Sequence, residues 1–255
     1  MKRTVTLLNH QRDKGKETST YRHPAVPIRV THRRYSAGKN FSVGSPRAEQ
    51  VLTLLSGELQ VSGPISARLA RRSVFEDPPV AVYVGRGQKV TVLGKKAGEL
   101  VIVECAAKKN GAVQVVRASG AEERGKEGFR RTVYNLIDEK FPAERLLMGE
   151  TFNQPGNWSS FPPHKHDRRS RDERRLQEVY FFKIQPEAGF AFMRLYDYGN
   201  LDEVFAIRNN DLVWIPRGYH PVSVVPGHSL YYLWALAGEG RKLKWNTDPQ
   251  FRWLL

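Results

Sequence analysis

A short segment with two histidines carries the residues best suited to chemistry. Residues 162–167 read Pro-Pro-His-Lys-His-Asp. On an extended strand, alternate side chains point to one face, so His164 and His166 lie together and Lys165 points away. Two imidazoles on one face can chelate a single metal ion. The segment therefore predicts half of a metal site.

A carboxylate on a second predicted strand supplies another candidate ligand. Residues 178–184 read Glu-Val-Tyr-Phe-Phe-Lys-Ile, a strongly strand-forming run. Alternation places Glu178, Tyr180 and Phe182 on one face and Lys183 on the other. Because an unpaired buried charge costs several kcal/mol, a carboxylate on such an apolar face needs a partner, and a metal ion is one.

A histidine at the end of a tight turn completes the expected site. Residues 216–221 read Pro-Arg-Gly-Tyr-His-Pro, where proline and glycine frame the turn and Pro221 favours an extended His220. We expect one divalent ion held by four residues: His164, His166, Glu178 and His220. Three imidazoles and one carboxylate suit zinc, manganese, iron or nickel better than magnesium, and we favour zinc or manganese.

Strand-forming runs recur along the whole chain and predict an all-β fold. β-Branched and aromatic residues are punctuated by Gly, Pro and Asn/Asp turns, which is typical of barrels and sandwiches. Asn110-Gly111 is expected to form a hairpin turn. Strands are expected at 51–55, 58–62, 80–84, 88–93, 100–106 and 112–117, and then at 131–137, 145–152, 177–184, 190–197, 203–207, 212–215, 221–225 and 230–238.

Two similar sets of strands predict two tandem barrels. The glycine-rich, charged stretch 118–130 is expected to be a linker or crossover. We therefore predict two antiparallel β-barrels, at residues 1–120 and 121–255. All four candidate ligands follow residue 160, so the metal is expected in the second barrel and none in the first.

Composition limits the partners and the compartment. The chain has 41 basic and 26 acidic residues, a net charge of +15, which favours an anionic partner. The basic residues are scattered and no nucleic-acid motif is present, so nucleic acid is not expected as a partner. No apolar run reaches the ~20 residues that span a membrane, so a membrane is not expected either. Cys105 is the single cysteine. The N-terminus begins like a signal peptide, but the polar stretch 9–14 interrupts the apolar segment that a signal peptide needs. We expect a cytoplasmic protein, and leave homo-oligomerisation open.

The residues around these histidines resemble those of a known family. Residues 156–167 (Gly-Asn-Trp-Ser-Ser-Phe-Pro-Pro-His-Lys-His-Asp) and 216–222 (Pro-Arg-Gly-Tyr-His-Pro-Val) look like the signature of the bacterial 5-deoxy-glucuronate isomerases of the cupin superfamily. The resemblance covers roughly residues 20–255. It implies a bicupin with one working metal site, and conversion of 5-deoxy-glucuronate to 2-deoxy-5-keto-gluconate in myo-inositol catabolism.

The resemblance also suggests residues that contact a sugar acid. On its predicted strand, Arg194 shares a face with Phe192 and Tyr196. An inward face would let Arg194 bind the substrate carboxylate and make Tyr196 part of the pocket wall, whereas an outward face would leave Arg194 in solvent. Tyr180 is expected to bind substrate or transfer a proton, or else to fill the barrel.

Departures from the family pattern keep related functions open. Met193 stands where the family has Gln, and Trp234-Ala235-Leu236 stands where it has Asn-Val-Met. The alternatives are a keto-deoxyuronate isomerase, a cupin dioxygenase and a non-catalytic sugar-binding cupin. For an isomerase, both an enediol route and an internal hydride shift remain to be tested.

Overall fold

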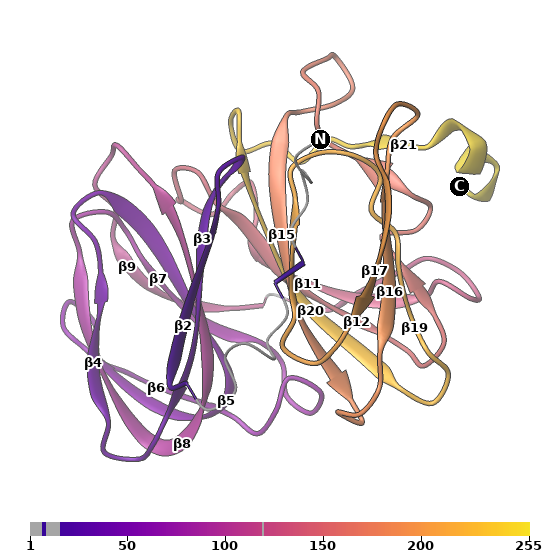
Figure 1. Ribbon diagram of the computed structural model, residues 1–255. Helices are drawn as coiled ribbons and strands as arrows, with labels where there is room; N and C mark the ends of the chain where they lie inside the picture. Colours follow the sequence, from indigo (N-terminus) through magenta and orange to yellow (C-terminus); the bar gives the residue numbers. More distant parts are fainter. Residues whose placement is uncertain (1–6, 9–15, 119) are drawn as a thin grey trace.

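The structure is a computed structural model that describes residues 7–8, 16–118 and 120–255. Nearly every element is a strand, and two antiparallel β-barrels lie side by side (Figure 1). The predicted all-β fold is confirmed. In the part of the chain that is described, no helix is long and apolar enough to cross a membrane. Residues 9–14, which we expected to interrupt a signal-peptide-like N-terminus, lie outside the described residues.

The N-terminal barrel is one sheet of eight strands. Its main order is β2-β3-β8-β5-β7-β9, with β4 paired to β8 and β6 paired to β5. The strands are β2 (Thr18–His23), β3 (Val26–Tyr35), β4 (Asn40–Gly44), β5 (Ala48–Ser62), β6 (Ala67–Arg71), β7 (Val80–Val84), β8 (Lys89–Ala106) and β9 (Val113–Arg117).

The C-terminal barrel is built from a seven-stranded and a four-stranded sheet. The larger sheet has the order β1 (Leu7–Leu8), β18 (Leu212–Ile215), β15 (Leu176–Gln185), β20 (Ser229–Gly238), β12 (Leu147–Asn153), β11 (Arg131–Ile137) and β10 (Glu122–Arg124). The smaller has the order β13 (Trp158–Ser159), β19 (Val222–Val224), β16 (Ala191–Tyr196) and β17 (Asp202–Ile207). β14 (His164–Lys165) and β21 (Asn246–Thr247) form a separate two-stranded sheet. The 3₁₀ helix η2 (Pro249–Leu254) follows β21.

The strand pairing corrects several expectations. Asn110-Gly111 is not a hairpin turn, because β9 pairs with β7 rather than with β8. The segment instead meets the β7–β8 loop, where Gly111 N–H donates to Arg86 O at 3.3 Å. β10 lies within the stretch expected to be a linker, and β2, β3, β4 and β6 were not predicted. Leu7–Leu8 pairs with β18, so it joins the sheet of the second barrel rather than the first.

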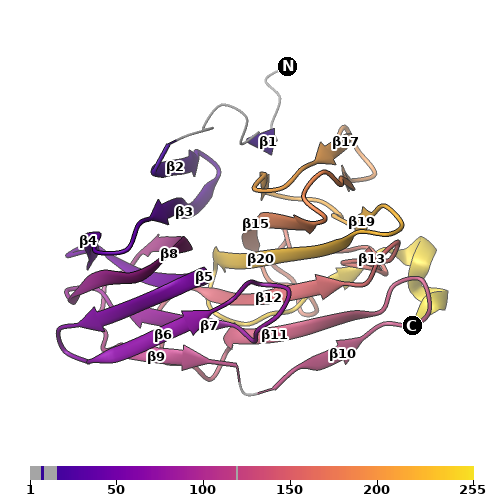
Figure 2. The ribbon, with the colours of Figure 1, turned by 90° about the horizontal axis from the view of Figure 1, so that it is seen from below.

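Both faces of the larger C-terminal sheet are buried, and this fixes which side chains enter the barrel. Along β15, Tyr180 and Phe182 belong to the core inside the C-terminal barrel. Val179 and Phe181 belong to a second core shared with the N-terminal barrel. Figure 2 shows the two barrels side by side along this contact. Glu178 has the same parity as Tyr180, as predicted, and so faces the barrel interior.

A buried ion pair joins the two barrels. Arg71 of β6 donates to both carboxylate oxygens of Glu150 on β12, at 2.9 and 2.7 Å, and to Leu54 O at 3.0 Å. Neither side chain of the pair is exposed to solvent. Close by in the same interface, Glu49 accepts three backbone N–H groups at 2.7 Å, from residues 144, 145 and 146. The buried carboxylates of Glu150 and Glu49 thus both have compensating donors.

We predict that Arg71→Met destabilises the protein by about 3–5 kcal/mol, because it leaves the Glu150 carboxylate buried without a counter-charge. Urea unfolding measures this change. The double variant Arg71→Met/Glu150→Leu should recover much of the loss. As a control, Arg194→Met removes an exposed pair and should cost roughly 0–1 kcal/mol. Equal losses in Arg71→Met and the control would contradict a structural role for the buried pair.

Candidate metal centre

Three elements bring the candidate ligands together. Glu178 faces inward from β15, and His166 follows β14 directly. His220 lies in the turn after β18, where Gly218 adopts φ +93°. A Cβ at Gly218 would lie 2.8 Å from Tyr196 O, so the turn needs glycine both for its conformation and for this close approach.

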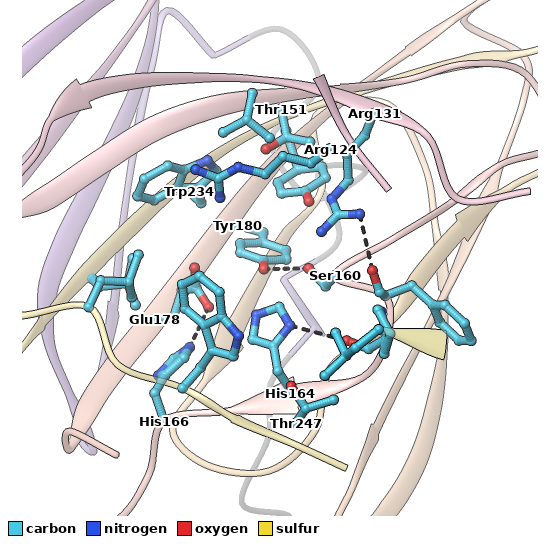
Figure 3. A pocket seen from close by; sticks show the side chains of 18 residues that line it. Arg124, Arg131, Thr151, Ser160, His164, His166, Glu178, Tyr180, Trp234 and Thr247 are labelled. Atoms are coloured by element: carbon cyan, nitrogen blue, oxygen red, sulfur yellow. Dashed lines mark hydrogen bonds and ion pairs between the residues drawn. The ribbon is translucent and has the colours of Figure 1, made fainter. Parts of the chain in front are cut away.

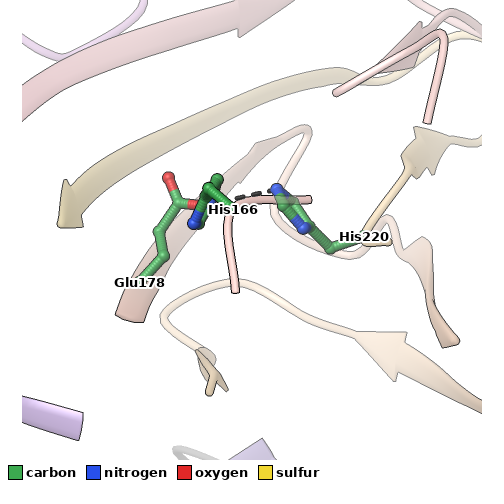
Figure 4. Close-up of side chains that lie close together, drawn as sticks. All are labelled: His166, Glu178 and His220. Atoms are coloured by element: carbon green, nitrogen blue, oxygen red, sulfur yellow. Dashed lines mark hydrogen bonds and ion pairs between the residues drawn. The ribbon is translucent and has the colours of Figure 1, made fainter. Parts of the chain in front are cut away.

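The side chains of His166, Glu178 and His220 converge on one point (Figure 4). One ligand atom from each lies within 4.8 Å of the other two, and all three residues are buried. Glu178 Oε2 lies 3.0 Å from His166 Nε2 and 3.3 Å from His220 Nε2. This spacing can hold a divalent metal ion between two imidazoles and a carboxylate.

Backbone carbonyls fix which imidazole nitrogen faces the centre. His166 Nδ1 lies 2.9 Å from Leu176 O, and His220 Nδ1 lies 3.0 Å from Gly218 O. A carbonyl only accepts, so each Nδ1 carries a proton and each ring directs its Nε2 at the Glu178 carboxylate. His220 Nε2 is buried without a hydrogen bond. Two imidazole Nε2 atoms directed at one carboxylate, with both Nδ1 atoms held by carbonyls, form an arrangement that fits a metal ion.

The pKa values of the histidines follow from burial and from Glu178. Burial disfavours the protonated form of His166, but the Glu178 carboxylate outweighs this and raises the pKa of His166. Burial lowers the pKa of His220 to about 4, so this ring is neutral at pH 7. Because a metal ion binds the neutral imidazole, it would displace the Nε2 proton that Glu178 favours on His166.

His164 stands beside this group without joining it closely. Its ring centroid lies 4.8 Å from that of His220 and 6.4 Å from that of His166. Its Nδ1 is 3.4 Å from Pro162 O, a longer contact than those of the other two rings. The structure therefore brings three of the four expected ligands together, and the role of His164 as the fourth stays a prediction.

A charged cluster behind the histidines holds the two parts of the site in register. Lys165 points away from the centre, as expected, and its Nζ donates to Asp167 at 2.5 Å and Glu173 at 3.0 Å. Glu173 also accepts the backbone N–H groups of residues 167 and 168. Asp167 accepts the N–H of Gly218 at 2.8 Å, which ties the histidine strand to the turn that bears His220.

A cavity lies over the centre and is lined by aromatic, hydroxyl and basic side chains (Figure 3). Tyr180 is hydrogen-bonded to Ser160 at 2.9 Å, between the two hydroxyl groups. Burial raises the pKa of Tyr180 well above its usual value, so this hydroxyl is neutral. Further lining residues are Arg124, Arg131, Thr151, Tyr232, Trp234, Leu236, Trp245 and Leu255.

The structure corrects the expected positions of Arg194 and Tyr196. Phe192 and Arg194 lie on the outer face of β16, since Met193 between them packs into the barrel core. Arg194 pairs with Asp202 at 2.7 Å and its side chain is 47% exposed. The Tyr196 hydroxyl is hydrogen-bonded to Asp248, away from the cavity. Neither residue contacts the metal centre, so the inward reading of this strand was wrong.

Sequence reasoning missed several residues that line or support the site. Arg131 and Ser160 lie on segments whose inward faces the pattern did not define, and Ser160 has φ +49°. Glu173 lies within a run dominated by arginines, which hid its buried position. Among the departures from the family pattern, Trp234 and Leu236 line the cavity, whereas Met193 does not.

Comparisons with known proteins show which family the chain belongs to. The model of the KduI/IolB family matches residues 9–254. A 5-deoxy-glucuronate isomerase from Halalkalibacterium halodurans is 34% identical over 229 residues, which cover 86% of this chain and 85% of that protein. The crystal structure of an IolB-like protein from Salmonella typhimurium LT2 matches with a TM-score of 0.85 at 29% identity, over 98% of this chain and 94% of that one.

A more distant structure supports the fold alone. The oxalate decarboxylase of Lactobacillus farciminis, solved as a formate complex, matches with a TM-score of 0.65 at 12% identity. The match covers 95% of this chain and 83% of that one, so it includes both barrels. With the family model spanning nearly the whole sequence, the expected bicupin architecture is confirmed, and the chain belongs to the KduI/IolB family.

Proposed function

We propose that the chain is a metal-dependent aldose–ketose isomerase that converts 5-deoxy-glucuronate to 2-deoxy-5-keto-gluconate. One observation carries the proposal: His166 and His220 direct their Nε2 atoms at Glu178 beneath a polar cavity. A relative that bears this enzyme's name is 34% identical over most of both chains. A sugar acid is then the partner. A cytoplasmic location is part of the proposal.

The reaction balances within the substrate. The carbon next to the aldehyde loses a hydrogen and becomes a ketone, while the aldehyde carbon gains a hydrogen and becomes a hydroxymethyl group. No external oxidant or reductant is consumed. A bound divalent ion would supply Lewis acidity where negative charge develops on the carbonyl oxygen. His166, Glu178 and His220 would hold this ion, with His164 as the fourth ligand, and zinc or manganese suits the set best.

Tyr180 is placed to act on the substrate directly. It lies on the same face of β15 as Glu178, two residues further along, and lines the cavity. Because its hydroxyl is neutral, it can donate a hydrogen bond or a proton to a substrate oxygen but is a poor base. The hydrogen bond to Ser160 holds the Tyr180 hydroxyl in position, and with Ser160 as the donor the Tyr180 proton is available to the substrate.

We predict that the purified protein holds about one divalent ion per chain, because the chain has a single set of converging ligands. His220→Ala should weaken metal binding by more than about 100-fold, beyond the loss caused by removing a supporting partner. Mass spectrometry of metals in dialysed protein measures the content, with His228→Ala, distant from the cluster, as the control. Full metal retention in a His164→Ala/His166→Ala double variant would contradict the assigned site.

We predict that the metal-loaded enzyme isomerises 5-deoxy-glucuronate without oxygen or a nicotinamide cofactor. The reaction in D₂O, followed by NMR under anaerobic conditions, also separates the two routes. Deuterium at the new hydroxymethyl carbon supports an enediol route, which we favour, and its complete absence supports an internal hydride shift. Turnover that requires oxygen would favour a dioxygenase instead, and preference for a keto-deoxyuronate would identify the related isomerase.

The Tyr180→Phe variant tests the role of the hydroxyl. We predict that kcat falls about 100-fold, at the lower end for loss of a proton donor, while metal content stays unchanged. Tyr134→Phe, on the same sheet but outside the cavity, is the matched control. Wild-type kcat in Tyr180→Phe would assign this ring to packing alone.

A further inference from the structure

One arginine in the cavity has no acidic partner. Arg131 begins β11, and its Nη1 donates to Phe129 O at 3.2 Å and to Phe161 O at 3.1 Å. Its Nε and Nη2 make no hydrogen bond to the residues that the structure describes. The guanidinium is therefore fixed by two main-chain carbonyls on one side and open to the cavity on the other.

The environment of Arg131 is unfavourable for a cation without an anion. Its guanidinium is partly buried, and Arg124 lies close enough to add repulsion. Glu178 is the one acidic residue among those that line the cavity, and it belongs to the metal centre. By contrast, the buried Arg71 is matched by Glu150. A buried charge left unpaired by the protein points to an anionic ligand.

The free edge of Arg131 has the right form for a carboxylate. With Nη1 occupied by carbonyls, Nε and Nη2 remain as a parallel pair of donors, the fork that binds two carboxylate oxygens. In Figure 3, Arg131 lies on the opposite side of Tyr180 from His166 and Glu178. An acid held by this fork would extend past Tyr180 toward the metal centre.

We propose that Arg131 binds the carboxylate of the substrate and thereby directs its aldehyde end to the centre formed by His166, Glu178 and His220. This inference rests on the proposed function and assigns to Arg131 the role that the sequence had suggested for Arg194. It makes Arg131 the residue that distinguishes uronic acids from neutral aldoses. A neutral sugar would leave the buried guanidinium unpaired and so be rejected.

The test compares two substrates that differ at one end: 5-deoxy-glucuronate and 5-deoxy-glucose, in which a hydroxymethyl group replaces the carboxylate. For Arg131→Gln, kcat/KM for the acid should fall about 100-fold, as expected for two charge-assisted hydrogen bonds, mainly through KM. The low activity on the neutral sugar should change less than threefold. Arg131→Lys, which keeps the charge but loses the fork, should show a smaller loss confined to the acid.

Control measurements separate the inference from folding and metal effects. Arg194→Gln removes an exposed arginine outside the cavity and should leave both substrates unaffected. Metal content and thermal unfolding of Arg131→Lys should match the wild type. Equal losses on the acid and the neutral sugar, or unchanged kinetics in both Arg131 variants, would overturn the role in carboxylate binding.

Calorimetric titration with 5-deoxy-glucuronate distinguishes failure of this inference from failure of the proposed function. If the wild type binds the acid but does not isomerise it, and Arg131→Gln weakens binding, the anchor stands and the isomerase function fails. If the wild type isomerises the acid and both Arg131 variants bind it normally, the function stands and the anchor fails. Absence of binding by the wild type would overturn both.

Discussion

The burial of both faces of strand β15 is the constraint on which the rest of the structure depends. Odd-numbered residues such as Val179 and Phe181 pack between the barrels, and even-numbered ones such as Tyr180 line the interior of the second barrel. A shift by one residue would move every side chain to the other face and place Lys183 in the barrel. The N-terminal barrel therefore holds Glu178 in place, although it contributes no side chain to the cavity.

Main-chain carbonyls orient several polar groups of the site. They fix the Nδ1 protons of His166 and His220 on one side of the cavity and the Nη1 group of Arg131 on another. Each group then presents its remaining nitrogens to the same space. A carbonyl oxygen cannot change its role from acceptor to donor, so the polarity of the site is set by the backbone. Side chains from distant segments then reach the cavity when their strands pair in the correct register.

The sequence predicted the fold class and the proximity of His166, Glu178 and His220 because both follow local rules. Alternation assigned Glu178 and Tyr180 correctly on β15, whose strand pattern is unbroken and whose two faces are both buried. The same rule did not show which face of β16 points into the barrel, because apolar Phe192 is 45% exposed and shares the outer face with Arg194. Alternation defines two faces but does not say which one is inside.

Pairing between distant segments was also beyond local rules. Asn110-Gly111 has favourable hairpin residues, yet β9 pairs with β7, an arrangement decided by the closure of the whole barrel. Likewise Arg131 begins β11 and is separated from His164 by β12 and β13, and nothing in its neighbourhood in the sequence marks it as a cavity residue. Such contacts depend on long-range packing.

The buried Glu173 has a consequence for how this protein can vary. It lies in a loop with four exposed arginines, Arg168, Arg169, Arg171 and Arg175, which contact solvent and can be exchanged at little cost to stability. Glu173 itself accepts two backbone N–H groups and shares the Lys165 ammonium with Asp167. The loop thus combines a freely mutable exterior with one buried carboxylate, so sequence diversity should concentrate on its arginines while the position of Glu173 is preserved.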